Sequence, residues 1–172
     1  VSKRDAYAFV KKHHSKLGAG RKLPPGLMYA IGVKVGHRLV AVALAGHPPG
    51  NWGDKRTDRG NILELTRIAS DGTVKGAASM LAARAIDLLE QSKRGDPSRP
   101  ALFVTYSYVG EPGTPYRALR EKGLRPVAIV RGEKAHGARA GGSAQRIDKV
   151  RWEAGPAADP PRWDLINQIP LL

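Results

Sequence analysis

The sequence predicts a single-domain α/β protein with a mixed central sheet flanked by helices. Its 172 residues, 41% of them hydrophobic, are enough for one buried core and too few for two comfortable domains. Apolar, β-branched runs alternate along the chain with segments whose apolar residues recur at helical spacing. The second half of the chain follows the order strand, glycine-bearing turn, helix, strand, helix, strand, which indicates the same class.

The first part of the chain predicts a helix, a β-hairpin and a third strand. Apolar residues at helical spacing form one stripe over residues 5–17, and Ser2 can cap this helix. The runs LMYAIGVKV and LVAVALAG, joined by a short glycine-containing connection, predict a hairpin. A polar loop rich in Pro and Gly, residues 47–60, has a length typical of functional loops and leads to the third strand, NILELTRIA.

The rest of the chain predicts two helices, two strands and a tail. The run SDGTVKGAASMLAARAIDLLEQSK predicts a turn and a helix, and ALFVTYSYV predicts a strand. The run TPYRALREKGLRPVAIVRG predicts a short helix that ends at Gly123 and a last strand. Residues 133–172 are rich in Gly, Pro and Ala and predict a tail that packs on a core of residues 1–132. Its apolar anchors would be Trp152, Trp163, Leu165, Ile166 and Ile169.

The charge of the chain favours a polyanionic partner. Lys and Arg number 29 against 15 Asp and Glu, which makes the formal net charge +14. Residues 1–60 carry 12 basic and 3 acidic side chains, a balance of +9. Nucleic acid is the polyanion that such an excess binds most commonly, because neutralised phosphates release counterions. The alternative is that the charge only keeps the protein soluble.

Composition also excludes several classes of site. The chain has no cysteine, so disulfides, zinc ribbons and thiolate nucleophiles are excluded. No apolar run approaches the roughly 20 residues of a membrane span, and the stretch VSKRDAYAF does not resemble a signal peptide. We therefore expect a cytoplasmic protein that does not bind a membrane. The sequence leaves open whether a metal is needed, and it leaves open the oligomeric state, a homodimer included.

The junction after the third strand predicts a phosphate site. A strand, a glycine-bearing turn and a helix start leave backbone N–H groups unpaired and direct the positive end of the helix dipole outward. Small side chains let an anion reach this backbone. Strands, Gly turns and Ala-rich helices also occur for packing alone, and Asp71 can simply initiate the turn before Gly72. The candidate cofactor-binding residues are Arg67, Gly72, Thr73, Lys75, Gly76, Ala77, Ala78 and Ser79.

The runs LELTRIASDGTVKGAASML, VTYSYVGEPGTPYRALREKGLRPV and DKVRWE resemble a family of small GNAT-like (N-acyltransferase) proteins of phages and other mobile elements. The likeness covers roughly residues 5–153. That family is similar to the phage DNA-modification enzyme Mom, which resembles GNATs in fold and makes a carbamoylmethyl adduct on the N6 amine of adenine. The resemblance implies a GNAT fold, acetyl-CoA or another acyl-CoA as cofactor, DNA as partner, and an anti-restriction role in the cytoplasm of a host cell.

Two features depart from the usual GNAT pattern. The pyrophosphate signature is Arg/Gln-x-x-Gly-x-Gly/Ala, whereas here Thr73 stands at the basic or amide position and Gly76 and Ala78 fill the small ones. Common acetyltransferases carry a Tyr about four residues before the Gly that ends the last helix, where it protonates the departing thiolate. Leu119 stands there in this chain. The available phenols are Tyr106, Tyr108 and Tyr116.

Glu64 is the candidate proton acceptor. A carboxylate within an apolar strand is commonly paired with a cation, yet beside the predicted cofactor loop it could accept a proton from an attacking amine. Period 2 predicts that Glu64 and Thr66 share one face of the strand and that Arg67 takes the other. His13 and His14 can cap the first helix, lie in solvent, contact phosphate, or replace Glu64 as acceptor if the helix covers the site.

The nucleic-acid contacts are expected in the first third of the chain. Trp52 lies in the polar loop among basic residues, where an indole can stack on a base or fold back onto the domain. The full set of candidates is Lys11, Lys12, His13, Arg21, Lys22 and Trp52.

Three functions fit the sequence. The leading one is acyl-CoA-dependent modification of an amine on DNA, with adenine N6 as the best match to the Mom resemblance. The second is an ordinary N-acetyltransferase of a small amine or a protein. The third is a nucleic-acid-binding module that keeps the fold without turnover, which the leucine at position 119 makes credible.

Overall fold

The computed structural model describes residues 1–14, 26–48, 61–92, 102–108, 114–130 and 148–168. Six strands form one mixed sheet in the order β1-β2-β3-β4-β6-β5. All neighbours are antiparallel except β3 and β4, which are parallel. The strands are β1 (Leu27–Val35), β2 (Arg38–Gly46), β3 (Ile62–Ser70), β4 (Leu102–Tyr108), β5 (Arg125–Val130) and β6 (Lys149–Ala154). The predicted α/β class with a mixed sheet is confirmed.

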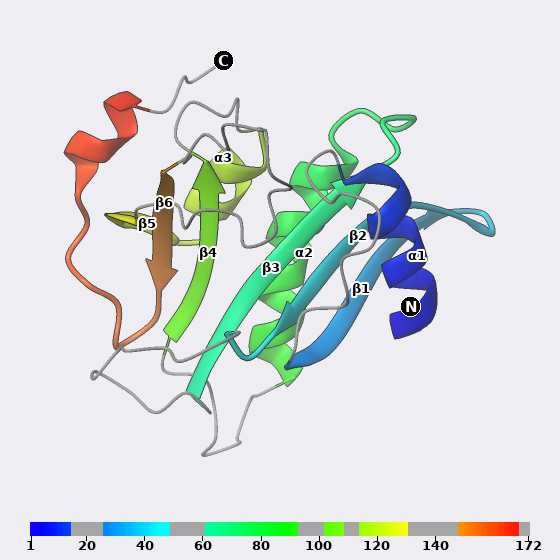
Figure 1. The fold of residues 1–172 in the computed structure, drawn as a ribbon, viewed down its shortest axis with the longest axis horizontal. Coiled ribbons are helices and arrows are strands. Elements are labelled where there is room, and N and C mark those ends of the chain that lie inside the picture. Colours follow the sequence, from blue (N-terminus) through cyan, green and yellow to red (C-terminus); the bar gives the residue numbers. More distant parts are fainter. Residues whose placement is uncertain (15–25, 49–60, 93–101, 109–113, 131–147, 169–172) are drawn as a thin grey trace, which may run out of the picture.

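Helices cover both faces of this sheet (Figure 1). The helical segments are α1 (Lys3–His13), α2 (Ala77–Ser92), α3 (Thr114–Glu121) and the 3-10 helix η2 (Trp163–Gln168). Ser2 caps α1 as predicted, because its Oγ accepts a hydrogen bond from the N–H of Asp5 at 3.0 Å. In the described part of the chain, no helix is long and apolar enough to cross a membrane.

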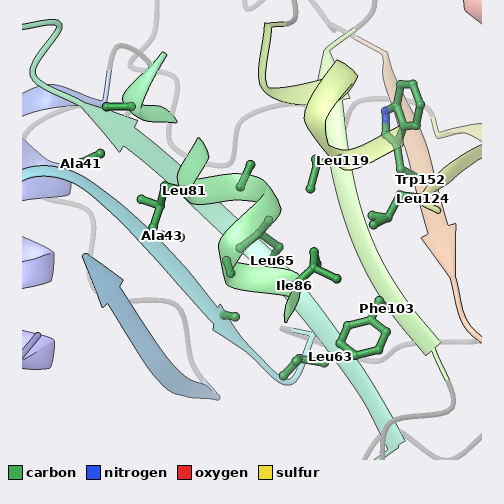
Figure 2. Packing of buried hydrophobic residues seen from close by; sticks show 14 of the residues in the cluster. Ala41, Ala43, Leu63, Leu65, Leu81, Ile86, Phe103, Leu119, Leu124 and Trp152 are labelled. Atoms are coloured by element: carbon green, nitrogen blue, oxygen red, sulfur yellow. The ribbon is translucent and has the colours of Figure 1, made fainter. Parts of the chain in front are cut away.

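Each face of the sheet has its own apolar cluster. On one face, Ala6 and Val10 of α1 pack against Val42, Leu44 and Ala69. We call this the α1 face. The opposite face packs against α2 and α3, and here β2 presents only alanines, so α2 can approach the sheet closely (Figure 2). This larger cluster includes Ala41, Ala43, Ala45, Leu63, Leu65, Leu81, Phe103, Leu119 and Trp152.

The sheet incorporates part of the segment that was expected to form a tail. Strand β6 lies between β4 and β5. Trp152 is 1% exposed, and its Nε1 donates to Ser107 Oγ at 2.9 Å. The Gly/Pro-rich composition of residues 133–172 conceals this strand, although Val150 and Trp152 alternate with charged residues as strand residues do. Trp152 packs in the core as expected, but it does so as a residue of a sheet strand and not from a tail that lies on the core.

Gly46 generates the first prediction, since it lies in register with both Leu27 and Glu64. An added Cβ would overlap the carbonyl oxygen of Gly26 and lie 2.9 Å from the Leu27 Cα, and both are backbone atoms. We therefore expect Gly46→Ala to lower the free energy of unfolding by about 2–3 kcal/mol in urea denaturation.

Gly32→Ala, in β1 of the same hairpin, is the control. A Cβ at Gly32 would meet only side chains, Leu39 Cδ1 and Val1 Cγ1 at 2.7 Å, and these can rotate away. Its cost should stay below about 1 kcal/mol. Equal costs for the two variants would show that the backbone contact at Gly46 does not constrain the hairpin.

Candidate functional site

The two parallel strands at the centre of the sheet separate partway along their length. Strands β3 and β4 pair only from Ile62 with Leu102 to Leu65 with Thr105. Beyond Leu65, β3 continues to Ser70 paired with β2, while β4 continues to Tyr108 paired with β6. Figure 1 shows β3 and β4 diverging toward their C-terminal ends. Among the described strands, β3 and β4 therefore do not pair with each other along the inner edges of the divergence.

A β-bulge in β3 lies at the point of divergence. Leu44 of β2 pairs with Arg67 and the next residue, Ala45, pairs with Leu65, so Thr66 is an extra residue in β3. Its Oγ1 donates to the carbonyl of Leu44 at 3.1 Å.

The bulge changes which side chains share a face. Leu65 belongs to the cluster under α2, and Ile68, three residues later, packs against the same cluster. Arg67 is in register with Leu44, which belongs to the α1 face. Glu64 alternates with Leu63 and Leu65 and so lies on the α1 face too. The expectation that Arg67 lies opposite Glu64 was wrong, because strict alternation fails at Thr66.

Glu64 is a buried carboxyl, 8% exposed, with no hydrogen bond or ion pair to any described residue. Burial raises its pKa from 4.5 to about 7. The positive charges of Arg67 and Lys149 act in the opposite direction and favour the carboxylate, but they do not outweigh the burial. The result is a group that is partly ionised near neutral pH, as a general base should be.

The loop of residues 71–76 joins β3 to α2. Its start is held on β2, because the Asp71 N–H donates to the carbonyl of Val40 at 3.0 Å. Asp71 Oδ1 accepts from the Thr73 hydroxyl at 2.7 Å and from its N–H at 2.9 Å, and these two bonds hold the pKa of Asp71 below its usual value. The role expected for Asp71 as a turn initiator is confirmed. Gly72 and Gly76 have φ of +77° and +78°, a conformation that favours glycine.

The first turn of α2 offers unpaired donors. Ala77 N–H bonds the carbonyl of Val74 at 3.2 Å, whereas no described residue accepts from the N–H groups of Ala78 and Ser79. The side chains around these groups are small. Arg38 adds positive charge, since its Nη2 donates to Thr73 Oγ1 at 2.9 Å, and Lys75 of the same loop is exposed. The structure thus brings the predicted cofactor residues from Gly72 to Ser79 together, in an arrangement that can hold phosphate.

The C-terminal end of α1 lies near this loop. The charge of His13 contributes to lowering the pKa of Asp71, and its ring packs on Phe9 with centroids 4.5 Å apart. His14 caps the helix through its N–H, which donates to the carbonyl of Val10 at 2.9 Å. Lys11 and Lys12 are exposed.

Only some of the predicted phenols can be placed. Tyr106 is partly buried and packs on the cluster of Ile62, Leu102 and Val104. It therefore shares the face of Glu64. Leu119, at the position of the usual GNAT tyrosine, is fully buried in the core under α2. The side chains of Tyr108 and Tyr116 lie outside the described residues, as do Arg21, Lys22 and Trp52.

Two basic residues of the site were not among the predicted ones. Lys149 of β6 acts on Glu64, and Arg38 of β2 bonds the loop. Neither residue lies near its partner in the sequence. The only sequence signal was for Lys149, which lies in DKVRWE, one of the runs that carry the family resemblance. Among the described residues, no group of three acidic or histidine side chains could hold a metal ion.

The raised pKa of Glu64 generates the second prediction. Between pH 4.5 and about 7 the unfolded chain releases this proton while the folded protein keeps it, so stability falls as pH rises through that window and levels above it. A pKa difference of about 2.5, at ~1.36 kcal/mol for each pKa unit, corresponds to roughly 3 kcal/mol. Glu64→Gln should match the wild type in denaturation at pH 4.5 and exceed its stability by up to that amount at pH 8.

Glu121→Gln is the matched control, because the Glu121 side chain is 67% exposed on α3. We expect its stability to follow that of the wild type across the same pH range. Parallel curves for Glu64→Gln and the wild type would mean that Glu64 is not desolvated in the folded protein.

Three solved structures resemble the chain closely enough in fold to be informative. An acetyltransferase from Bacillus subtilis in complex with CoA superimposes with a TM-score of 0.53 at 15% identity, over 90% of this chain and 93% of that one. Aminoglycoside 6'-acetyltransferase type Ii has a TM-score of 0.53 at 12% identity, over 91% and 92%. An acetyltransferase of the GNAT family from Streptococcus pneumoniae has a TM-score of 0.50 at 11% identity, over 90% and 77%.

No protein-family model matches the chain, and no curated protein sequence matches it. The similarity to phage Mom therefore stays a prediction from sequence. The structural likeness, at 11–15% identity, concerns the fold. The chain has the GNAT fold, as its sequence predicted.

Proposed function

We propose that the protein transfers an acyl group from acyl-coenzyme A to an amine. The observation that carries this proposal is Glu64, a buried carboxyl with a pKa of about 7 at the divergence of β3 and β4. The GNAT fold supports the same reaction class, and a solved structure of similar fold is bound to CoA.

The loop of residues 71–76 and the first turn of α2 fit the pyrophosphate of coenzyme A. The unpaired N–H groups of Ala78 and Ser79 would donate to phosphate oxygens, and the α2 dipole favours negative charge at this end. Arg38 and Lys75 would add to the attraction. Bound acyl-CoA supplies an acyl carbon activated as a thioester.

Glu64 would act as the general base. Its carboxylate accepts the proton that the acceptor nitrogen loses on attack, and a pKa of about 7 balances ionisation against basicity at neutral pH. For an aliphatic amine, Arg67 and Lys149 would assist, because positive charge nearby lowers the pKa of an ammonium group and so increases the fraction of neutral amine.

The proton donor to the leaving sulfur differs from the usual one. Leu119 is buried in the core and has no proton to donate. Tyr106 is a described phenol on the face of Glu64, one residue beyond the last β3–β4 pair, and we assign it this role. Tyr116 remains the alternative that the sequence suggested.

An amine on DNA is the acceptor that we favour. This choice rests on the net charge of +14, on the exposed Lys11 and Lys12, and on the predicted Mom resemblance. A small amine or a protein fits the GNAT fold equally well. Mass spectrometry of nucleosides separates the two, with DNA from cells that express the chain compared with DNA from cells that carry an empty vector. An adduct on adenine would support DNA as the acceptor. Unmodified nucleosides would favour a small amine or a protein.

The third prediction tests the cofactor site through Ser79→Asp. A carboxylate in the first turn of α2 interacts favourably with the helix dipole, so the fold should be retained, yet it would repel a pyrophosphate. We expect CoA affinity, measured by calorimetry, to fall by about tenfold or more while thermal stability is unchanged or higher.

Ser2→Asp makes the same chemical change at the start of α1, where Ser2 already caps the helix. CoA affinity should be unaffected there. Unchanged CoA binding by Ser79→Asp would mean that the cofactor binds elsewhere. No binding by the wild type at millimolar CoA would mean that CoA is not the cofactor.

The fourth prediction concerns the rate. Below pH 7, kcat/KM should rise about tenfold for each pH unit as Glu64 ionises and then level off. Glu64→Gln should lower kcat about 10²-fold or more and abolish this rise, with CoA binding preserved. Full activity and an unchanged pH profile in the variant would show that Glu64 is structural.

A further inference from the structure

We propose that Arg67 anchors the acceptor through an oxyanion, so that the preferred acceptors are amines that carry a carboxylate or phosphate close to the nitrogen. This inference rests on the proposed acyl transfer and identifies the substrate class for the same site. It differs from the expectation that Arg67 contacts the cofactor.

The bulge fixes the Arg67 guanidinium. Its Nη1 donates to the carbonyl of Thr66 at 2.6 Å, and Thr66 is the extra residue that has no register partner on β2. A planar guanidinium that is held at one nitrogen cannot turn its other donors freely.

The opposite edge of this guanidinium is unused. Nε is buried, and no described residue accepts a hydrogen bond from it. Nη2 has no acceptor in the same part of the chain either. Nε–H and Nη2–H are parallel donors on one edge, the geometry that binds the two oxygens of a carboxylate or phosphate. A buried donor without an acceptor is costly, and an oxyanion would remove that cost.

Glu64 does not supply the missing anion. No ion pair joins Arg67 to Glu64, although the two charges interact, and Glu64 is only partly ionised near neutral pH. Lys149 adds a second positive charge to the surroundings of Glu64. The charge of the Arg67 guanidinium, whose Nε is buried without an acceptor, is what an anionic acceptor would offset.

The positions of the two side chains limit how far the oxyanion of the acceptor can lie from its nitrogen. Glu64 and Arg67 lie on the α1 face at either side of the bulge, and at ~3.3 Å per residue their Cα atoms are at most about 10 Å apart. An amine whose oxyanion is held by Arg67 would place its nitrogen toward Glu64. The phosphate-binding loop begins farther along the chain, at Asp71, with its own donors at Ala78 and Ser79.

The experiment compares anionic acceptors with neutral counterparts. Tyrosine with tyramine tests a carboxylate, phosphoethanolamine with ethanolamine tests a phosphate monoester, and single-stranded DNA with its free nucleosides tests a phosphodiester. Binding to the full chain saturated with CoA is measured by calorimetry, which needs no turnover. Initial rates with acetyl-CoA are measured separately.

We expect at least one anionic member to bind about tenfold or more tightly than its neutral counterpart. Arg67→Met should remove this preference, and Arg67→Lys should restore only part of it, because an ammonium keeps the charge and lacks the paired donors. Arg84→Met is the control, since Arg84 is exposed on α2, and should keep the preference. The class that shows the Arg67-dependent preference identifies the oxyanion.

Two results would overturn the inference. One is that no pair shows a preference that depends on Arg67. The other is that Arg67→Met and Arg67→Lys weaken CoA binding itself, which would assign Arg67 to the cofactor. Arg67-dependent binding without any acyl transfer would leave the inference standing and contradict the proposed function instead.

Discussion

The extra residue in β3 is the constraint on which the candidate site depends. If β3 paired with β2 without the bulge at Thr66, Arg67 would point into the cluster under α2, where a guanidinium would be buried among Leu65, Leu81 and their neighbours. The bulge instead turns it to the face of Glu64. The bulge at Thr66 directly follows Leu65, the last residue of β3 that pairs with β4. The change in side-chain direction therefore coincides with the end of the β3–β4 pairing.

Charge at this place is governed by burial more than by neighbours. Two nearby cations would ordinarily keep the pKa of a glutamate low. The pKa of Glu64 is nevertheless raised to about 7, because burial withdraws water from the carboxyl. Arg67 in turn forms no ion pair with a described carboxylate, Glu64 included. A buried guanidinium edge without an acceptor favours a reactant that brings negative charge, and the coenzyme A proposed above would bring such charge to the α2 end of the same strand.

Sequence reasoning recovered what depends on short-range patterns. The cap at Ser2, the turn at Asp71 with positive-φ glycines, and the strand–loop–helix junction each lie within a few residues. The bulge could not be found this way, because it is defined by the register between β3 and a strand more than twenty residues earlier. The pairing of β6 between β4 and β5, which brings Lys149 toward Glu64, is likewise a long-range fact.

The leucine at position 119 bears on what kind of enzyme the fold can support. Leu119 is fully buried and shares a cluster with Leu124 and Trp152, so the last helix uses this position to pack against the sheet. A tyrosine there would have to bury its hydroxyl in that cluster or displace α3. In the proposed reaction the proton donor would then come from another element, and β4, whose pairing with β3 ends at Thr105, is the element that reaches the divergence. In this protein the acid and the base would thus stand on the two strands that part, with the acyl carbon between them.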